Sequence, residues 1–484
     1  MARILTATAL ALALGTPAQA GSAPSSRGPL KSTLDRIVSR AEFANSLWGV
    51  QVRDLRSGKG LYSLNEGLSL TPASTLKLAT TAAALDAYGP SATLATTVES
   101  AARLDGAGRV LGDVFLVGRG DPMIWESSSE APVTGFDRLA DALVAAGVKR
   151  IDGRLVGNEA AFTGSRRPVD WGWGDLMWYY GADVSALVFN NSAVHLTAAP
   201  GERVGDPISL ERNPRSAYYQ VVVTATTAAP ESKPDLAVDR PLGSNVVRIG
   251  GTLPQGAAAE SLFVSVEDPA RFAATVFAET LEARGIRVRG PVETSSSVLP
   301  PDTRTLATLT SPPMSEMVKQ VNQPSHNLRA EMLLRLVGQR MRGEGSAEAG
   351  LAATRDFLSR QGVPLDGWAL RDGCGLADSN LVTASGLVTL LTSMHRHQYA
   401  VAFQDSLALA GVDGTLKRRF QGTRVEGHLR AKSGAIRQTY TLAGFATTRR
   451  GETLVFAILL NHFAGDSAIA YAAINDICDA LVAR

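Results

Sequence analysis

Cysteine and histidine are scarce in this sequence. Its 484 residues contain two cysteines and six histidines. One pair of cysteines, Cys374 and Cys478, is too few for a scaffold built on disulfides, and the sequence leaves open whether the two meet. His395 and His397 lie two positions apart and point in different directions on a helix, and the six histidines form no metal-ligand pattern. The sequence therefore predicts no metal site, and it contains no pattern for an organic cofactor.

A strong excess of one charge and long apolar runs are also missing. The formal net charge is +2, with no long run of either sign, which argues against a nucleic-acid partner. Beyond the first twenty residues, no segment reaches about 18 consecutive apolar residues, so no transmembrane helix is predicted. Peripheral association with a membrane and the oligomeric state stay open.

The N-terminus has the pattern of a secretory signal peptide. Met1-Ala2-Arg3 supplies a positive start, residues 4–15 an apolar core and Ala18-Gln19-Ala20 a cleavage site. We therefore expect residues 1–20 to be removed and the mature protein, beginning near Gly21, to be exported.

The order of element types predicts an α+β protein with an insertion. A chain of this length exceeds one simple core, so more than one domain is expected. A hairpin near the start and antiparallel strands near the end suit one sheet built from both ends of the sequence. Between the hairpin and these strands, the residue pattern changes to alternating strands and helices and then to short strands alone, before it changes back. We expect a catalytic domain at 30–96 and 303–484, an insert domain of βαβ texture at 97–190 and 260–302, and a small β-rich domain nested in it at 191–259.

Three short motifs carry the candidate chemistry. Ser74 and Lys77 open an apolar helix, where positions i and i+3 share a face, so the lysine reaches the serine hydroxyl. A Ser-x-x-Lys pair is expected about once by chance in such a chain, and alone it fits a capped surface helix. Ser325-x-Asn327 precedes an amphipathic helix, and Lys432-Ser433-Gly434 lies in a β-patterned stretch. In this order the three resemble the signature motifs of penicillin-binding proteins and class A β-lactamases.

These residue types suit acyl transfer through a serine. The Ser74 hydroxyl must lose its proton to a nearby base as it attacks a carbonyl carbon. Lys77 becomes that base if its pKa falls from about 10.4, which burial and a second cation, Lys432, would both favour. We expect Ser325 to relay a proton to the leaving amine and Asn327 to hold the substrate amide.

The third motif predicts the substrate-binding edge of the site. The backbone N–H groups of Ser74 and Ala435 are the expected oxyanion donors, and Gly434 lets a substrate lie close to the strand. Lys432 and Ser433 are expected to bind a terminal carboxylate. The ligand is then a peptide C-terminus or a compound that mimics one.

From about residue 45 to the C-terminus, the chain resembles the DacB-type D-alanyl-D-alanine carboxypeptidases/endopeptidases, which are low-molecular-mass class C penicillin-binding proteins. Beyond the three motifs, the likeness includes residues 112–118 with 120–122, 184–187 leading to 190–191, 372–376 before 380–382, and 442–445. The resemblance implies a transpeptidase-like domain of antiparallel sheet and helices, as in β-lactamases, interrupted by nested extra domains. It also implies removal of D-alanine from peptidoglycan stem peptides, cleavage of D-alanyl cross-links, or both, in the periplasm, and acylation of Ser74 by β-lactams.

The chain departs from the family pattern at several positions. Ser433 stands where threonine is typical, a change that keeps the hydroxyl. Cys374, Ala377 and Asp378 stand where the family often has two serines and an arginine, so the contacts of that loop are open. Cys374 is either a reactive thiol or a buried small side chain, and His326 either transfers a proton or points away from the site.

The aromatic segment 171–180 resembles a family stretch that approaches the active site from the insert. Asp175 and Tyr180 are therefore candidates for contacting the polar or amino end of a stem-peptide side chain. The alternative is that the segment is an aromatic anchor that packs one domain on another.

Two other functions remain compatible with the motifs. A β-lactamase or esterase on the same scaffold would hydrolyse penicillin rapidly instead of holding it as a stable ester. A non-catalytic cell-wall-binding protein would retain peptidoglycan without acylation of Ser74.

Overall fold

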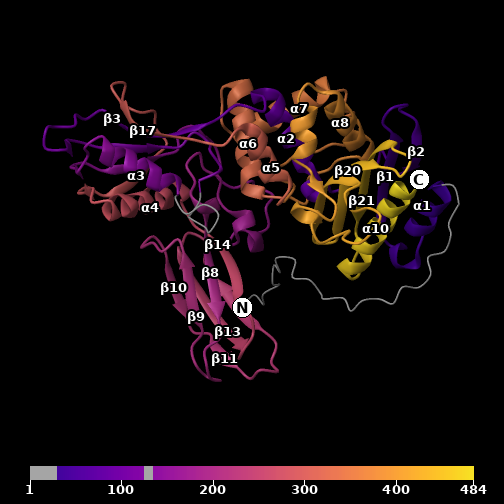
Figure 1. Cartoon of the computed structure of the whole chain (residues 1–484), viewed down its shortest axis with the longest axis horizontal. Helices are drawn as coiled ribbons and strands as arrows, with labels where there is room; N and C mark the ends of the chain where they lie inside the picture. The colour runs from indigo at the N-terminus through magenta and orange to yellow at the C-terminus, as the bar shows by residue number, and fades with distance from the viewer. Residues whose placement is uncertain (1–29, 125–133) are drawn as a thin grey trace.

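Two distant pieces of the chain build the largest part of the molecule. The structure is a computed structural model that describes residues 30–124 and 134–484, so the predicted signal peptide lies outside the described residues. This catalytic part comprises α1 (Leu30–Val38), β1 (Leu47–Asp54), β2 (Gly60–Leu64), α2 (Lys77–Tyr88), α5 (Met314–Asn322), α6 (Asn327–Arg342), α7 (Ala347–Arg360), α8 (Ala384–Arg396), α9 (Ala400–Asp405), β18 (Ala408–Leu409), β19 (Leu429–Ile436), β20 (Thr439–Thr447), β21 (Thr453–Asn461) and α10 (Ser467–Ala483). Figure 1 shows it on the right, with an insert on the left and a narrow all-β part below.

The centre of the catalytic part is a six-stranded antiparallel sheet in the order β18-β19-β20-β21-β1-β2. Its strand β21 reads as an almost unbroken apolar run because both of its faces are buried. Val455 and Leu459 pack in the core that includes α2 and α8, whereas Phe456 and Leu460 pack in the core that includes α1 and α10. The sheet therefore lies between two helical layers (Figure 1). Its strands come from both ends of the sequence, as the element order predicted.

Helix α2 lies inside the helical layer. It contacts α5, α6 and α7, and its residues from Lys77 to Leu85 are all buried. A helix that is apolar on every side is stable only when it is surrounded by protein. The sequence LATTAAAL that follows Lys77 thus carries this lysine into the core.

The insert is a separate α/β layer pair. It contains β3 (Ala95–Ser100), β4 (Arg109–Val110), β5 (Val114–Val117), α3 (Gly135–Ala145), β6 (Arg150–Ile151), β7 (Leu155–Asn158), α4 (Pro269–Ala283), β15 (Arg287–Val288), β16 (Val292–Ser295) and β17 (Arg304–Thr310). Strands β16, β7 and β5 are parallel, as the βαβ texture predicted, and β3 and β17 continue the same sheet in antiparallel pairs. Strands β6 and β7 follow each other closely in the sequence but belong to different sheets, and Gly153 between them packs against the backbone of Gly112.

The all-β part contains β8 (Ala193–Ala199), β9 (Ser209–Asn213), β10 (Gln220–Val223), β11 (Thr226–Ala228), β12 (Asp235–Asp239), β13 (Val246–Pro254) and β14 (Glu260–Ser265). They form one sheet around β13 and a second in the order β14-β8-β9. Strand β14 pairs with β8 of this part, and β17 pairs with β3 of the insert. The domain boundaries expected at residues 259 and 302 are therefore shifted: β14 belongs to the all-β part and not to the insert, and β17 belongs to the insert and not to the catalytic part.

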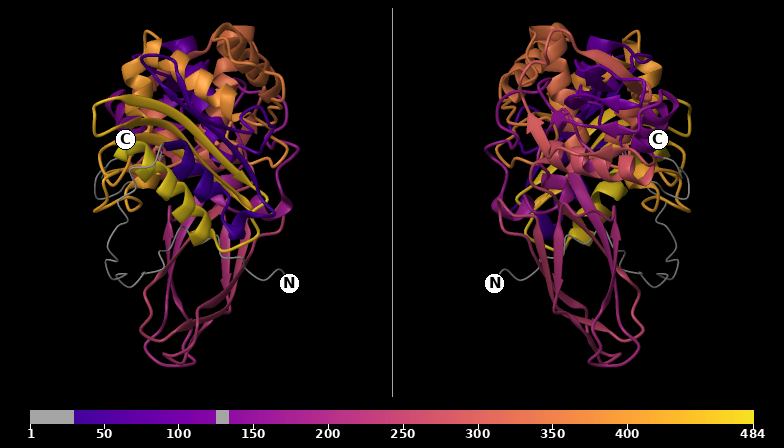
Figure 2. Two further views of the ribbon diagram at one scale, coloured as in Figure 1. Left: turned by 90° about the vertical axis from the view of Figure 1, so that its right-hand side faces the viewer. Right: turned by 90° about the vertical axis from the view of Figure 1, so that its left-hand side faces the viewer.

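The all-β part extends away from the other two parts, as the side views show (Figure 2). Within residues 30–124 and 134–484, no helix combines the length and the apolar character that crossing a membrane requires.

Candidate active site

Ser74 lies in a 3₁₀ turn, Ala73–Leu76, that leads into α2. We expected the serine at the start of the α-helix, but the α-helix begins at Lys77. In a 3₁₀ turn, residues i and i+3 are eclipsed, which places the Lys77 side chain directly over Ser74. Lys77 Nζ donates a hydrogen bond of 2.8 Å to Ser74 Oγ. The predicted contact between hydroxyl and amine is thus confirmed, with a tighter local geometry than expected.

Lys77 uses all three hydrogens that an ammonium group has. Besides Ser74 Oγ, its Nζ donates to Asn327 Oδ1 at 2.7 Å and to the carbonyl oxygen of Cys374 at 2.7 Å. The side chain is fully buried, and this burial lowers its pKa, opposed by the nearby Cys374, Asp372 and Glu331. A neutral amine keeps two hydrogens, which satisfy Asn327 and Cys374. Its lone pair is then directed at the Ser74 hydroxyl.

Ser325 and Asn327 form the wall opposite Ser74. Ser325 has a φ of 65°, in the left-handed region, and Asn327 is the first residue of α6. The amide of Asn327 accepts from Lys77 through Oδ1 and donates through Nδ2 to the carbonyl oxygen of Tyr180 at 2.9 Å. The turn before α6 therefore joins the base to the segment 171–180 of the insert.

Lys432 is buried on β19 and faces Ser325. Its Nζ donates to Ser325 Oγ at 2.9 Å and to the carbonyl oxygen of Ser433 at 2.7 Å. Burial lowers the pKa of Lys432 well below its ordinary value, and the charge of Lys77 lowers it further. Burial is also the main cause of the lowered Lys77 pKa, and the repulsion between the two ammonium groups acts on both of them.

The hydroxyl of Ser433 lies 2.7 Å from Thr415 Oγ1. Thr415 follows a short loop after β18 and was not among the residues singled out in the sequence, because it belongs to none of the three motifs. The two hydroxyls together present a polar edge beside the buried ammonium group of Lys432.

Gly434 brings β19 against the Ser74 turn. A Cβ atom at this position would lie 2.3 Å from Thr441 Oγ1 and 2.8 Å from the backbone nitrogen of Ser74. Only glycine permits this approach. Thr441 in turn donates to the carbonyl oxygen of Pro72 at 2.8 Å, which ties the sheet to the serine turn. Ala435 follows on the same strand and is exposed.

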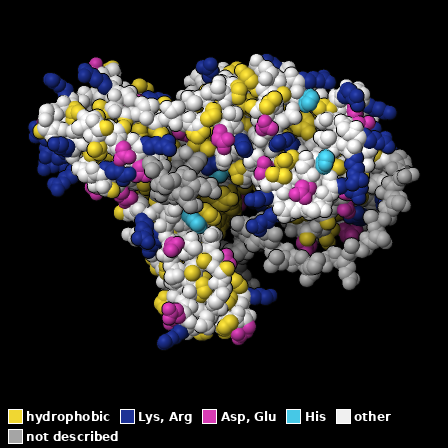
Figure 3. All heavy atoms as spheres, viewed as in Figure 1, with side chains coloured by type: hydrophobic (Ala, Val, Ile, Leu, Met, Phe, Trp, Pro, Cys, Tyr) yellow, Lys and Arg dark blue, Asp and Glu magenta, His cyan; other side chains and the backbone are white. Residues whose placement is uncertain are grey.

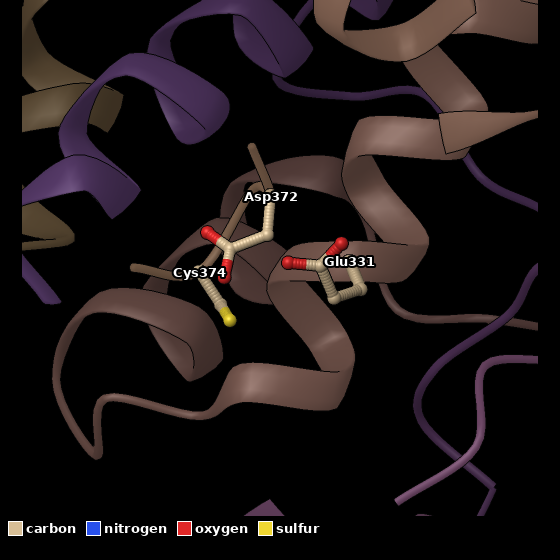
Figure 4. A group of neighbouring side chains, drawn as sticks. All are labelled: Glu331, Asp372 and Cys374. Carbon is tan, nitrogen blue, oxygen red and sulfur yellow. The ribbon is translucent and has the colours of Figure 1, made fainter. Parts of the chain in front are cut away.

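A cluster of Glu331, Asp372 and Cys374 lies behind Lys77. All three side chains are buried, their donor atoms lie within 4.8 Å of one another, and Figure 4 shows them directed toward a common centre. Glu331 Oε1 accepts from the backbone N–H of Gly373 at 2.7 Å. Burial, reinforced by the charge of Asp372, raises the pKa of Glu331 to about 7.

The donor set of this cluster fits loop positioning better than a metal. Asp372 accepts four hydrogen bonds, from Gly375 N, Ala377 N, Asn380 Nδ2 and Trp171 Nε1, so no carboxylate lone pair remains for an ion. These bonds hold the loop 372–377, whose Cys374 carbonyl contacts Lys77. The sequence contained no signal for the cluster, since its decisive contact is a backbone carbonyl.

Asp175 and Tyr180 lie at the mouth of the site, with Arg437 between two carboxylates. Arg437, in the turn between β19 and β20, pairs with Asp378 and lies 3.8 Å from Asp175. Burial raises the pKa of Asp175, with Arg437 opposing the effect. Trp171, in contrast, is buried in the catalytic core. The buried Trp171 fits the anchor alternative, and contact of Asp175 and Tyr180 with a stem-peptide side chain stays a prediction.

The surroundings of three further side chains, Cys374, Cys478 and His326, fit roles in packing and helix capping. Cys374 and Cys478 are both buried and unpaired, and burial raises the pKa of each thiol. The Cys374 thiol therefore fits packing, and its carbonyl makes the contact with Lys77. His326 caps α6 by accepting from Arg329 N through Nδ1 at 3.5 Å, and burial lowers its pKa well below the ordinary value. These contacts are those of a helix cap.

Comparison with known proteins gives one family. The sequence profile of the D-Ala-D-Ala carboxypeptidase 3 (S13) family matches residues 30–483. The D-alanyl-D-alanine carboxypeptidase of Actinomadura sp. (strain R39) is 33% identical over 467 residues, covering 94% of this chain and 85% of that protein. The D-alanyl-D-alanine carboxypeptidase DacB of Haemophilus influenzae is 24% identical over 421 residues, covering 86% of this chain and 85% of that protein.

Solved structures show the same fold. Penicillin binding protein 4 (dacB) from Haemophilus influenzae superimposes with a TM-score of 0.79 at 23% identity, over 93% of this chain and 98% of that one. The same protein complexed with a β-lactam superimposes with a TM-score of 0.75 at 22% identity, over 93% of this chain and 99% of that one. The chain therefore belongs to the D-Ala-D-Ala carboxypeptidase 3 (S13) family and is a serine-type D-alanyl-D-alanine carboxypeptidase.

Proposed function

We propose that Ser74 is the nucleophile and Lys77 its general base, acting on the terminal D-alanyl-D-alanine of peptidoglycan stem peptides. The observation that carries this assignment is the set of three acceptors around Lys77 Nζ. As a neutral amine, Lys77 takes the Ser74 proton while its remaining hydrogens stay bonded. Ser74 Oγ then bonds to the carbonyl carbon, and the carbonyl oxygen becomes an oxyanion.

The remaining motif residues suit the later steps. The N–H groups of Ser74 and Ala435 receive the oxyanion, which Gly434 allows to approach. The proton on Lys77 passes through Ser325 to the nitrogen of D-alanine as the peptide bond breaks. Water then attacks the ester on Ser74 and gives up its proton to the same base. Lys77 returns this proton to Ser74 Oγ as the ester bond breaks, and the shortened peptide leaves.

The carboxylate of the departing residue fits the polar edge on β19. One of the hydroxyls of Ser433 and Thr415 donates to the other, and the hydrogen of the second is available there, with the buried Lys432 adding positive charge behind the pair. Lys432 Nζ donates to Ser325 and to the Ser433 carbonyl, which leaves the third hydrogen of the ammonium group for the carboxylate. The expectation that Lys432 binds the carboxylate directly is therefore kept.

Asp175 and Tyr180 are proposed to face the side chain of the stem peptide. Two carboxylates share one guanidinium there, so Asp175, Asp378 and Arg437 have a net negative charge when ionised. Such a group favours a side chain that ends in an amine. Whether this subsite serves a carboxypeptidase, an endopeptidase or both is decided by which bond of intact peptidoglycan is cut.

Labelled penicillin tests the assignment directly. We expect a stable ester whose tryptic peptide contains Ser74, and no label in Ser74→Ala. Ser359→Ala, an exposed serine on α7, is the matched control and should be labelled normally. Label at another residue would refute the assignment. Rapid release of hydrolysed penicillin would favour the β-lactamase alternative, and peptidoglycan binding without label would favour the non-catalytic one.

A digest of purified peptidoglycan separates the two peptidase activities. Loss of one D-alanine per stem peptide indicates a carboxypeptidase, and conversion of cross-linked dimers to monomers indicates an endopeptidase. Mass spectrometry of the products distinguishes them in one experiment. Ser74→Ala should yield neither set of products.

We also propose that the protein is exported to the periplasm. The support is the charged start, apolar core and cleavage pattern of residues 1–20. N-terminal sequencing of the protein recovered from a periplasmic extract should begin near Gly21. A protein that keeps Met1 and stays with the cytoplasmic fraction would contradict the proposal.

A further inference from the structure

Exposed aromatic side chains gather in one region of the molecule. Among residues 30–124 and 134–484, the exposed aromatic residues are Trp173, Tyr179 and Phe263, with relative exposures of 81%, 37% and 38%. Two of them belong to the segment 171–180 at the mouth of the active site, and Phe263 contacts this segment through Tyr179. Large apolar groups left in water at one place mark a binding surface.

Tyr179 begins a row of rings that leads away from the active site. The neighbouring Tyr180 carbonyl accepts from Asn327, so the row starts at the wall beside the base. The Tyr179 and Phe263 centroids lie 5.6 Å apart, and Phe263 stacks on His195 at 4.2 Å with an interplanar angle of 6°. We call Tyr179, Phe263 and His195 the aromatic row. Hydrophobic side chains line the hollow between the all-β part and the catalytic part (Figure 3).

The sheet β14-β8-β9 continues this row with polar groups. Phe263 pairs with His195 across β14 and β8, and His195 pairs with Asn213 across β8 and β9. Because side chains alternate along a strand, Thr197 and Glu211, the next pair on these two strands, share this face. His195, Thr197, Glu211 and Asn213 line a depression of about 600 Å³.

This combination suits a sugar. A pyranose ring presents a face of C–H groups with partial positive charge, which stacks on the electron-rich face of an aromatic ring. Its hydroxyl and N-acetyl groups pair with amide, carboxylate and hydroxyl side chains such as Asn213, Glu211 and Thr197. Burial lowers the pKa of His195, so its ring is uncharged near neutral pH and stacks without the cost of desolvating a charge.

We propose that the aromatic row is a saccharide subsite that holds the glycan carrying the stem peptide under attack. The proposal rests on the proposed function, since it needs a peptidoglycan substrate. The row starts beside Asn327 and follows the face of the β14-β8-β9 sheet. Sugar and peptide therefore bind at the same time, and the sugar adds affinity to the D-alanyl end.

Hydrolysis of one peptide with and without its sugar tests the proposal. The substrates are a D-alanyl-D-alanine pentapeptide alone and the same peptide joined to its N-acetylated disaccharide. We expect a lower KM for the disaccharide form by about 2- to 10-fold, the size of one or two aromatic contacts. Phe263→Leu, which keeps apolar volume but loses the ring, and His195→Ala should lose this preference. Val222→Ala, an exposed valine of the same all-β part, should keep it.

The outcomes separate this proposal from the proposed function. Acylation by penicillin, which has no sugar, should be equal in all four proteins; if the wild type is not acylated at Ser74, the proposed function fails instead. Equal KM values for both substrates would overturn the subsite. So would an equal loss on both substrates in Phe263→Leu, because the row would then contact the peptide.

Direct binding provides a test that needs no catalysis. A tetramer of N-acetylglucosamine is titrated into Ser74→Ala by calorimetry, with and without Phe263→Leu. We expect binding that weakens by about 2- to 10-fold when the ring is removed. Binding that is absent at millimolar sugar, or that is unchanged by Phe263→Leu, would overturn the proposal.

Discussion

Glu331→Gln removes a buried charge behind Lys77, and its effect on stability should depend on pH. The pKa of Glu331 is raised from 4.5 to about 7 in the folded protein. The folded state thus holds this proton more tightly than the unfolded chain does, so ionising Glu331 destabilises the fold. The destabilisation is absent below the unfolded pKa, grows as the pH rises, and is complete above about pH 7. At about 1.4 kcal/mol for each tenfold difference in proton affinity, it amounts to about 3 kcal/mol.

Glutamine keeps the shape and the acceptor for Gly373 N but has no charge to ionise. Thermal unfolding of both proteins between about pH 5 and pH 8 measures the effect. We expect the difference in Tm, Glu331→Gln minus wild type, to increase as the pH rises, by on the order of 5 °C over the whole range. Glu42→Gln, an exposed glutamate in the catalytic part, is the control and should show no such trend. A difference in Tm that is the same at both ends of the range would refute the reasoning.

The same variant predicts a change in the reaction. The charge of Glu331 raises the pKa of Lys77, so its removal lowers that pKa. More of the base is then neutral at low pH, and the acid limb of the acylation rate should move to lower pH. Stopped-flow acylation with a fluorescent penicillin measures this limb. A shift in the opposite direction would mean that Glu331 acts through the loop geometry and not through its charge.

Three other substitutions test neighbouring contacts. Gly434→Ala places a methyl group 2.3 Å from Thr441 Oγ1 and so pushes β19 away from the Ser74 turn. Acylation by penicillin should slow by about 10²-fold or more, which is the effect of losing one oxyanion donor. An unchanged rate would show that β19 moves freely. Cys374→Ala should leave acylation within about twofold, because the group that contacts Lys77 is the backbone carbonyl, and under denaturing conditions thiol reagents should then modify Cys478 alone; a tenfold loss of acylation would assign a role to the Cys374 thiol. Arg437→Ala removes the cation that faces the two carboxylates and should therefore lower KM for peptides with an amine-ending side chain. The decrease should be no more than about fivefold, because half-exposed ion pairs contribute about 1 kcal/mol or less. A higher KM would contradict the proposed subsite charge.

Much of the catalytic site was predictable because its side chains follow regular spacing. Ser74 and Lys77 meet because residues three apart share a face in a helical turn, whichever type of helix forms. Lys432 and Ser325 meet at 2.9 Å although 107 positions separate them, which no local pattern shows. The combination of motifs predicted that both residues line one site, but the hydrogen bond between them is visible only in the structure.

The rest of the site depends on groups that leave no trace in a local pattern. The carbonyl oxygen of Cys374 is an acceptor that every residue type provides, so its contact with Lys77 is visible only in the fold. Glu331 reads as one more polar position on α6 until its burial is known. Strand β14 has an unremarkable β pattern, and its partner β8 is selected by the packing of the whole all-β part.

The pairing of β1 with β21 delays the appearance of the nucleophile during synthesis. Leu47 pairs with Asn461 and Asp54 with Leu454, so contacts of very high sequence separation hold the sheet together. Such contacts pay the entropy of closing a long loop before they form. The Ser74 turn also needs Thr441 and Asn461, which bond to its flanking residues. A nascent chain without β20 and β21 therefore lacks the contacts that hold the Ser74 turn, and we expect it to be inert toward penicillin until these strands have been made.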